Sequence, residues 1–229
     1  MSLFIVSTPI GNLQDITLRA IETLKSVDLV LCEDTRVTGG LLHHLGIKKE
    51  MSVLSDVNEE NSIYKIIELL ESGKNVALVS DAGTPLISDP GFKLVRTALQ
   101  KGIQVIPIPG ANAITTALSA SGLPTDKFLF LGFPPDSVEK KKHFFSNLKT
   151  SLESLSENKL KATVVFYESP HKLLRCFDAL EEVFGDIEVV VARELTKIYE
   201  EFLTQKVSEQ KKHFETSSPK GEFVILFRV

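Results

Sequence analysis

Short apolar segments rich in Val, Ile and Leu alternate along the chain with longer segments whose apolar residues recur at helical spacing. This alternation is typical of βαβ units, in which helices pack against a mixed or parallel sheet. In the first half of the chain, each apolar segment precedes a loop and then a helical pattern. The strands predicted there are Leu3–Ser7, Asp28–Cys32, Asn75–Val79 and Ile103–Ile108.

Two helices of the first half have ends that the sequence defines. A helix is predicted over Glu59–Ser72, because Gly73 provides a C-terminal stop and four apolar residues share one face, namely Ile63, Ile66, Ile67 and Leu70. A second helix is expected after the Asp-Pro pair at 89–90. Asp89 is there the predicted N-cap and Pro90 the first helical residue.

Turn-forming residues at 121–126 interrupt the pattern, and a new strand follows them. We therefore predict two α/β domains, residues 1–123 and 124–229. In the second domain, residues 200–205 allow one more strand, and a Lys-rich surface helix is expected from there to Glu215. The main elements predicted in this domain are strands Phe128–Phe133, Ala162–Tyr167, Ile187–Arg193 and Glu222–Val229, and helix Pro170–Phe184.

Composition narrows the class of protein. The 229 residues are 43% hydrophobic and 24% charged, which is ordinary for a globular protein that buries a sizeable core. No segment reaches the roughly 18 apolar residues of a membrane helix, and Leu3–Val6 is too short for a signal peptide, so a cytoplasmic protein without a membrane partner is expected. Cys32 and Cys176 have no metal-binding spacing, so buried free thiols and no metal site are expected.

The formal net charge of -4 argues against a protein that holds nucleic acid by bulk positive charge. The densest basic run is Lys140–Lys142. A solvated helix face is the simpler interpretation of this run, and contact with RNA phosphates is the sharper alternative.

Polar loops follow several predicted strands. Residues 7–12 contain one glycine, and the chain has neither GxGxxG nor GxxxxGK[ST], so a dinucleotide fingerprint and a P-loop are both unsupported. Residues 80–91 are dense in Asp, Gly, Ser and Pro, which indicates a rigid loop that exposes backbone amides and a carboxylate. In that loop Asp81 is a candidate acceptor for ribose hydroxyls, and Gly83 permits close approach to a ligand.

Further loops of this kind follow other strands. Residues 107–113 are small and leave room for a planar ligand. Acidic and basic residues alternate in Glu33–Arg36 and Arg193–Lys197, and a polar segment spans Tyr167–His171. Each cluster alone is explained by a salt-bridged loop. Several such clusters at one edge of a sheet would instead line a charged cleft.

Taken together, these loops resemble the bacterial 16S rRNA (cytidine-2′-O)-methyltransferases, a family within the tetrapyrrole methylase superfamily. The resemblance implies two α/β domains with S-adenosylmethionine bound in the cleft between them, and a homodimer. It also implies methylation of one ribose in the decoding centre of the small ribosomal subunit. The strings that resemble the family are Thr8–Asn12, Cys32–Arg36, Ser80–Gly91, Phe166–His171, Ala192–Lys197 and Pro219–Phe223.

The resemblance also implies cofactor contacts, many of them through main-chain atoms. By position these fall on Ile10, Asp81, Gly83, Thr84, Asn112, Ala113, Phe166 and Ala192. A ribose hydroxyl is a poor nucleophile at neutral pH, so a nearby carboxylate or neutral lysine is expected to accept its proton during attack. The candidates are Glu33, Asp34, Glu194 and Lys197, with Arg36 better suited to a phosphate because its fork makes bidentate contacts.

Two other functions remain open. A C-methylase acting on a tetrapyrrole intermediate would share fold and cofactor, although its superfamily members carry a glycine-rich first loop where this chain has Thr8–Asn12. A module that holds a nucleotide-like ligand without turnover is an alternative of another class.

Overall fold

The computed structural model describes residues 1–54, 59–217 and 219–229, without the side chains of residues 59–61. Within these ranges the chain forms two compact units, residues 1–112 and 113–229. The predicted boundary between residues 123 and 124 gave helix α5 (Ala113–Ala120) to the first domain. In the structure α5 packs against a strand of the second unit, which moves the division to the loop before the helix.

The first unit is built on a parallel sheet whose strand order is β3-β2-β4-β1-β5. The four strands predicted in this half are confirmed, with ends shifted by at most one residue. The edge strand β3 was not predicted, because its side chains are mostly exposed and form no apolar run. The strands are β1 (Ser2–Val6), β2 (Leu29–Cys32), β3 (Glu50–Val53), β4 (Val76–Leu78) and β5 (Gln104–Ile108).

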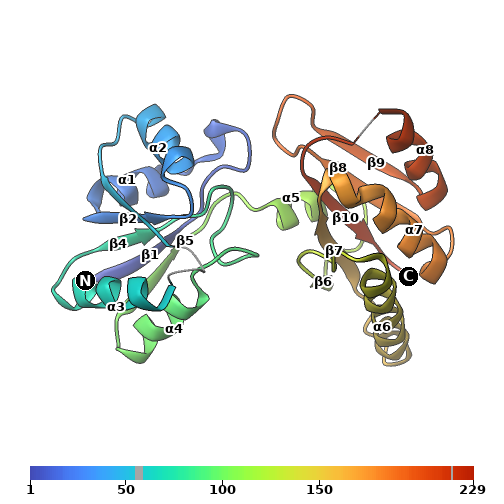
Figure 1. Ribbon diagram of the computed structural model, residues 1–229, viewed down its shortest axis with the longest axis horizontal. Helices are drawn as coiled ribbons and strands as arrows, with labels where there is room; N and C mark the ends of the chain where they lie inside the picture. The colour runs from blue at the N-terminus through green and yellow to red at the C-terminus, as the bar shows by residue number, and fades with distance from the viewer. Residues whose placement is uncertain (55–58, 218) are drawn as a thin grey trace. The chain divides into compact units, whose positions relative to one another are not determined.

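Helices cover both faces of this sheet, as Figure 1 shows. Side chains alternate along each strand, so Leu3 and Ile5 join the core beneath α3 and α4, while Phe4 and Val6 join the core beneath α1 and α2. The predicted apolar face of α3 is buried in that first core. The helices are α1 (Leu18–Ser26), α2 (Thr35–His44), α3 (Glu59–Glu71) and α4 (Phe92–Gln100), with a 3-10 turn at Leu13–Asp15.

The order of the strands matters for the site. β4 lies between β1 and β2, whose following helices α1 and α2 pack on one face, while β4 itself leads to α4 on the other face. The loop after β4 therefore diverges from the loops on both sides of it. In open α/β sheets, ligands bind where loops at the carboxyl ends of neighbouring strands diverge in this way.

The start of α4 differs from the prediction. Asp89 is not the N-cap: Gly91 takes that position with a φ of 122°, and Phe92 begins the helix. The Asp89 carboxyl instead bonds to the Ser80 side chain, and its burial raises its pKa. A Cβ at Gly91 would lie 2.7 Å from Cδ2 of Leu78, so close packing on β4 fixes where the helix begins.

The second unit has a mixed sheet of order β6-β7-β10-β8-β9. β6 and β7 are parallel, and β10 runs antiparallel to both β7 and β8. The carboxyl ends of β6, β7 and β8 therefore share one edge of the sheet. All four main strands predicted here are confirmed, and the optional strand at 200–205 forms β9. The strands are β6 (Phe128–Phe130), β7 (Thr163–Glu168), β8 (Glu188–Arg193), β9 (Glu201–Lys206) and β10 (Phe223–Phe227).

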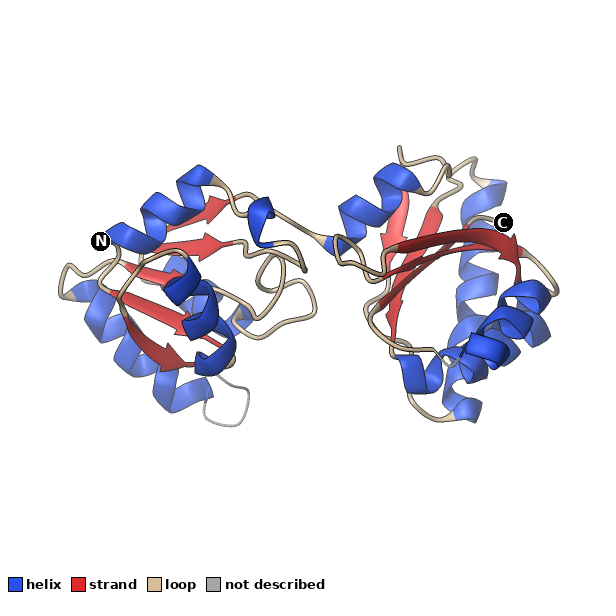
Figure 2. Cartoon of the chain, turned by 90° about the horizontal axis from the view of Figure 1, so that it is seen from above, coloured by secondary structure: helices blue, strands red, loops and turns tan. Residues whose placement is uncertain are grey.

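Three helices cover one face of this sheet and α5 covers the other (Figures 1 and 2). The helix predicted from Pro170 opens with a 3-10 turn over Pro170–Lys172 before the α-helix starts. None of the helices in the described ranges is both long and apolar enough to cross a membrane. The three helices are α6 (Val138–Glu157), α7 (Leu173–Phe184) and α8 (Val207–Ser217).

The predicted solvated face at Lys140–Lys142 is wrong for its middle residue. The side chains of Lys141 and Glu168 are each 1% exposed, and the Lys141 Nζ pairs with Oε2 of Glu168. Neighbouring Lys142 pairs at the surface with Glu182. Cys176 hydrogen-bonds to Glu168, and burial raises its pKa well above the ordinary value for a thiol. Both cysteines are free and buried, as predicted.

Candidate functional site

Four polar loops leave the carboxyl ends of β1, β2, β4 and β5, and hydrogen bonds join them to one another. Thr8 and Gly83 exchange two backbone bonds, of 2.9 Å from the Thr8 N and 3.1 Å from the Gly83 N. The Thr8 hydroxyl also donates to the Ser80 carbonyl at 3.1 Å. The loop after β1 is thus fixed to the loop after β4, at the point where the two diverge.

Gly83 is the position where these two loops approach most closely. Its φ is 84°, a conformation that favours glycine. A Cβ there would lie 3.1 Å from Cγ2 of Ile10. The structure therefore brings together two residues, Ile10 and Gly83, that the sequence assigned to one cofactor site.

The Thr84 hydroxyl joins a third loop to this pair. It donates to the Ala111 carbonyl at 3.1 Å. The Ser7 Oγ lies 3.0 Å from the Thr84 Oγ1. The next residue, Asn112, is the last of the first unit, and Ala113 begins α5 in the second. Gly110 belongs to the same contact, since a Cβ there would meet Cβ of Ser7 at 2.8 Å. Small residues thus let three loops pack at one sheet edge.

The loop after β2 contacts the Asp81 region. The Asp34 N donates to Oδ1 of Asp81 at 3.1 Å, and the Asp81 N donates to Oε1 of Glu33 at 3.4 Å. Arg36 binds both oxygens of Asp34, with Nη2 2.5 Å from Oδ2. These hydrogen bonds lower the pKa of Asp34 to about 2, and both of its carboxylate oxygens are occupied by Arg36.

In the second unit, the loop after β8 is bound to the loop before β10. Oε1 of Glu194 accepts from Nζ of Lys197 at 2.9 Å and from the Glu222 N at 3.0 Å. Lys197 also donates to Oε2 of Glu222 at 3.0 Å. A Cβ on Gly221 would lie 2.5 Å from the Glu194 side chain, so a glycine is needed for Glu194 to sit there.

The Glu194–Lys197 pair keeps both groups ionised. Burial acts to raise the pKa of Glu194, but the bonds from Lys197 and the Glu222 N outweigh it and lower that pKa. Burial likewise acts to lower the pKa of Lys197, but Glu194 and Glu222 raise it. Glu194 and Thr196 also have φ values of 49° and 65°. Backbone strain of this kind is concentrated at functional sites.

Two predicted contacts lie inside the second sheet. The Phe166 side chain is fully buried and packs on Phe145 and Phe227. Ala192 is also fully buried and pairs with Val224 of β10. The structure brings neither side chain to the loops at the sheet edge.

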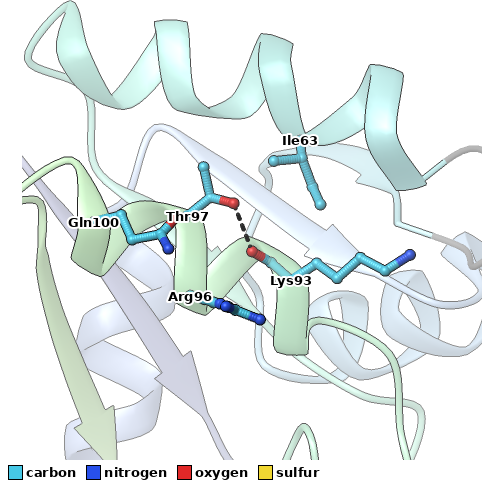
Figure 3. A pocket seen from close by; sticks show the side chains of 5 residues that line it. All are labelled: Ile63, Lys93, Arg96, Thr97 and Gln100. Atoms are coloured by element: carbon cyan, nitrogen blue, oxygen red, sulfur yellow. Dashed lines mark hydrogen bonds between the residues drawn. The ribbon is translucent and has the colours of Figure 1, made fainter.

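A surface pocket of about 420 Å³ lies elsewhere, between α3 and α4. In Figure 3 Ile63 comes from the buried face of α3 and the other labelled side chains come from α4, and the Thr97 hydroxyl donates to the Lys93 carbonyl. Among the residues whose side chains are described, its lining holds no carboxylate and no thiol. We therefore place the candidate site at the joined loops.

Among the described residues, no three His, Cys, Asp or Glu gather as a metal ion would require.

The sequence did not identify the residues that brace the loops. Ser7, Thr8 and Ser80 join loops that are more than 70 residues apart, and Gly110 and Gly221 make room for side chains of other loops. Gly221 lies in a string that carried the family resemblance, so that string contained a signal. The partners of the two glycines depend on the fold.

The model for tetrapyrrole (corrin/porphyrin) methylases matches residues 2–210. The chain belongs to this family. Among curated tetrapyrrole methylase relatives, a protein of Thermotoga maritima is 46% identical over 98% of this chain and 96% of its own length. A Bacillus subtilis protein is 46% identical over 98% of this chain and 74% of its own length. Both are named ribosomal RNA small subunit methyltransferase I.

Solved structures show that the tetrapyrrole methylase fold extends over the whole chain. Diphthine synthase aligns with a TM-score of 0.75 at 18% identity, over 100% of this chain and 90% of its own. Cobalt precorrin-4 methyltransferase aligns with a TM-score of 0.69 at 17% identity, over 98% of this chain and 94% of its own. The predicted α/β class and two-sheet architecture are confirmed.

Proposed function

We propose that this protein uses S-adenosylmethionine to methylate the 2′-hydroxyl of a cytidine ribose in the decoding centre of 16S rRNA. The observation that carries the proposal is the 45–46% identity, over 98% of the chain, to relatives named ribosomal RNA small subunit methyltransferase I. The substrate is the small ribosomal subunit or its rRNA, and the protein acts as a homodimer.

The loops of the first unit suit this cofactor. Asp81 presents an exposed carboxylate that can accept hydrogen bonds from a ribose diol. Gly83 and Gly110 let the loops that would hold the cofactor pack closely, since a Cβ at Gly83 would meet Ile10 and one at Gly110 would meet Ser7. Ile10 adds an apolar surface, Thr84 holds the loops together, and Asn112 and Ala113 offer main-chain groups beside them. Phe166 and Ala192 stay in the proposal only as main-chain contacts.

S-adenosylmethionine supplies an electrophilic methyl group on a sulfonium, so the protein has to orient the acceptor and remove its proton. We assign the proton acceptor to Glu194. Its Oε1 is held by Lys197 and the Glu222 N, and within the described residues its Oε2 accepts no hydrogen bond. A ribose hydroxyl that donates to Oε2 would be oriented for attack. Lys197, held as a cation, fixes the carboxylate and does not act as the base.

The acidic cluster of the first unit has a different role in this proposal. Glu33 and Asp34 act by bonding the Asp81 loop, since each makes a hydrogen bond with Asp81. Arg36 is 88% exposed and already ionised against Asp34, so it is placed to contact an RNA phosphate.

The test is transfer of a labelled methyl group. Wild-type protein is incubated with labelled S-adenosylmethionine and either small ribosomal subunits that lack the modification or a uroporphyrinogen-type substrate. Label in a cytidine ribose of 16S rRNA supports the proposal. Label in the tetrapyrrole, or cofactor binding without transfer to either substrate, overturns it. Glu194→Gln should abolish transfer and keep cofactor binding, whereas Glu188→Gln, at the opposite end of the same strand, should leave both unchanged.

A further inference from the structure

An aromatic cluster lies at the carboxyl ends of β6 and β7 in the second unit. Phe133 is 59% exposed, and its ring centroid is 5.3 Å from that of Tyr167. Tyr167 in turn meets Phe130 edge-on, with 5.1 Å between the centroids. Single exposed apolar residues are common on protein surfaces. Here the exposed Phe133 ring rests on Tyr167, which rests in turn on Phe130, and we call these three rings the aromatic face.

This face is held rigid. Pro134 and Pro135 follow Phe133, and a proline restricts the backbone of the residue before it. The Tyr167 N donates to the Gly132 carbonyl at 2.8 Å, which fixes the turn to β7. Lys172 pairs with Asp136 and joins the same turn to the segment after β7. A ligand that stacks on Phe133 would therefore lose little entropy by ordering the ring.

The aromatic face shares a sheet edge with the proposed catalytic pair. Phe223 of β10 lies in register with Glu168 of β7 on one side and Arg193 of β8 on the other. Glu168 and Arg193 are therefore two strand spacings apart, or about 10 Å. Tyr167 directly precedes Glu168, and Glu194 directly follows Arg193. That separation suits a nucleotide chain with one base on the aromatic face and a neighbouring ribose near Glu194.

Basic side chains follow Phe133 and Tyr167 closely along the chain. Lys140, in the first turn of α6, and His171, in the 3-10 turn after β7, are both exposed. Within the described part of the chain neither has an acidic partner. Aromatic rings combined with backbone-neutralising cations are the means by which proteins bind unpaired RNA bases.

We propose that Phe133 and Tyr167 form a stacking site for an unpaired nucleobase of the RNA substrate, next to the nucleotide whose ribose is methylated. The inference rests on the proposed function, because it takes RNA as the ligand. It adds a binding site that positions the acceptor strand and is separate from the groups that contact its ribose.

Direct stacking can be read from a single tryptophan, because the chain contains none. In Phe133→Trp, a 12-nucleotide single-stranded RNA should quench the indole fluorescence, with a midpoint that equals the dissociation constant measured by anisotropy. The matched control is Tyr64→Trp, since Tyr64 is 67% exposed on α3 of the first unit and should show no quenching. Equal quenching of both variants, or quenching of neither, would overturn the stacking site.

Steady-state methylation kinetics give a second test of the stacking site. Phe133→Ala should raise the KM for small ribosomal subunits by roughly five- to a hundredfold, as expected for loss of one stacked base. Its kcat and its affinity for S-adenosylmethionine should stay within about twofold of wild type, and Tyr64→Ala should change none of these. If wild type transfers label to rRNA and Phe133→Ala matches it in every constant, the stacking site is refuted and the proposed function stands.

Two further outcomes separate the alternatives. If wild type labels no rRNA but RNA still quenches Phe133→Trp, the proposed function fails and the stacking site survives. If light scattering shows that Phe133→Ala changes the oligomeric mass, the aromatic face contacts a second copy of the chain, and the stacking site is overturned.

Discussion

Replacing Lys141 with methionine would leave the Glu168 carboxylate buried without its cation. Each side chain is 1% exposed, so water cannot replace the lost partner. Breaking a buried pair in this way typically costs about 3–5 kcal/mol. Methionine is close to lysine in volume, so little of the cost should come from a cavity.

Two contacts that remain around Glu168 reduce the expected loss of stability. Oε1 of Glu168 keeps its bond from the Ser169 N at 2.9 Å, and Cys176 remains beside the carboxyl group. These remaining contacts offset part of the loss, so we expect Lys141→Met to lower the free energy of unfolding by about 3–4 kcal/mol.

Urea unfolding followed by far-UV circular dichroism measures this loss of stability. Hydrogen exchange of the β7 amides assigns the transition to the second unit. Lys142→Met is the matched control: the Lys142 pair with Glu182 is exposed, so its loss should cost less than about 1 kcal/mol. A double variant, Lys141→Met with Glu168→Met, should regain most of the lost stability. Equal losses for Lys141→Met and Lys142→Met, or a double variant no more stable than Lys141→Met, would refute the reasoning.

Three predictions concern the proposed site. Gly221→Ala should displace the Glu194 side chain, because the new Cβ would lie 2.5 Å from it. Single-turnover methylation should then show kcat lowered by roughly 10- to 100-fold, while calorimetry shows little change in cofactor affinity. Lys197→Met should move the acid limb of the kcat/KM profile to higher pH, because Lys197 helps to hold the pKa of Glu194 low against burial; an unmoved limb would rule out Glu194 as the base. Gly83→Ala should weaken S-adenosylmethionine binding roughly tenfold, because the new Cβ would meet Ile10 and because the positive φ at this position costs an alanine about 1–2 kcal/mol. An unchanged affinity in calorimetry would count against this cofactor site.

The sequence predicted the elements whose signal is local. Of the ten strands in the part of the chain that the structure describes, nine were anticipated, because most are buried apolar runs bounded by turns. The exposed edge strand β3 escaped because the sequence pattern reflects burial, and its pairing with β2 does not depend on burial.

Errors arose where a contact between distant residues decided the outcome. Asp89 stands before a proline, as an N-cap would, but its carboxyl bonds to Ser80 and the helix starts after Gly91. Lys141 reads as one residue of a basic run, and only its pairing with Glu168, 27 residues later, explains its burial. The site follows the same rule: the polar loops were found from their composition, whereas the bonds that join them required the fold.

The strand order of the second unit also bears on how the chain is made. The first sheet has all five of its strands once residue 108 has been synthesised. The second sheet has β10 at its centre, between β7 and β8, although β10 is the last strand along the chain. Until β10 leaves the ribosome, the β6–β7 and β8–β9 pairs have no strand between them and expose unpaired edges of the kind that promote aggregation. The two halves of the protein therefore mature at different times during translation, and the half that contains the proposed catalytic pair is the later one.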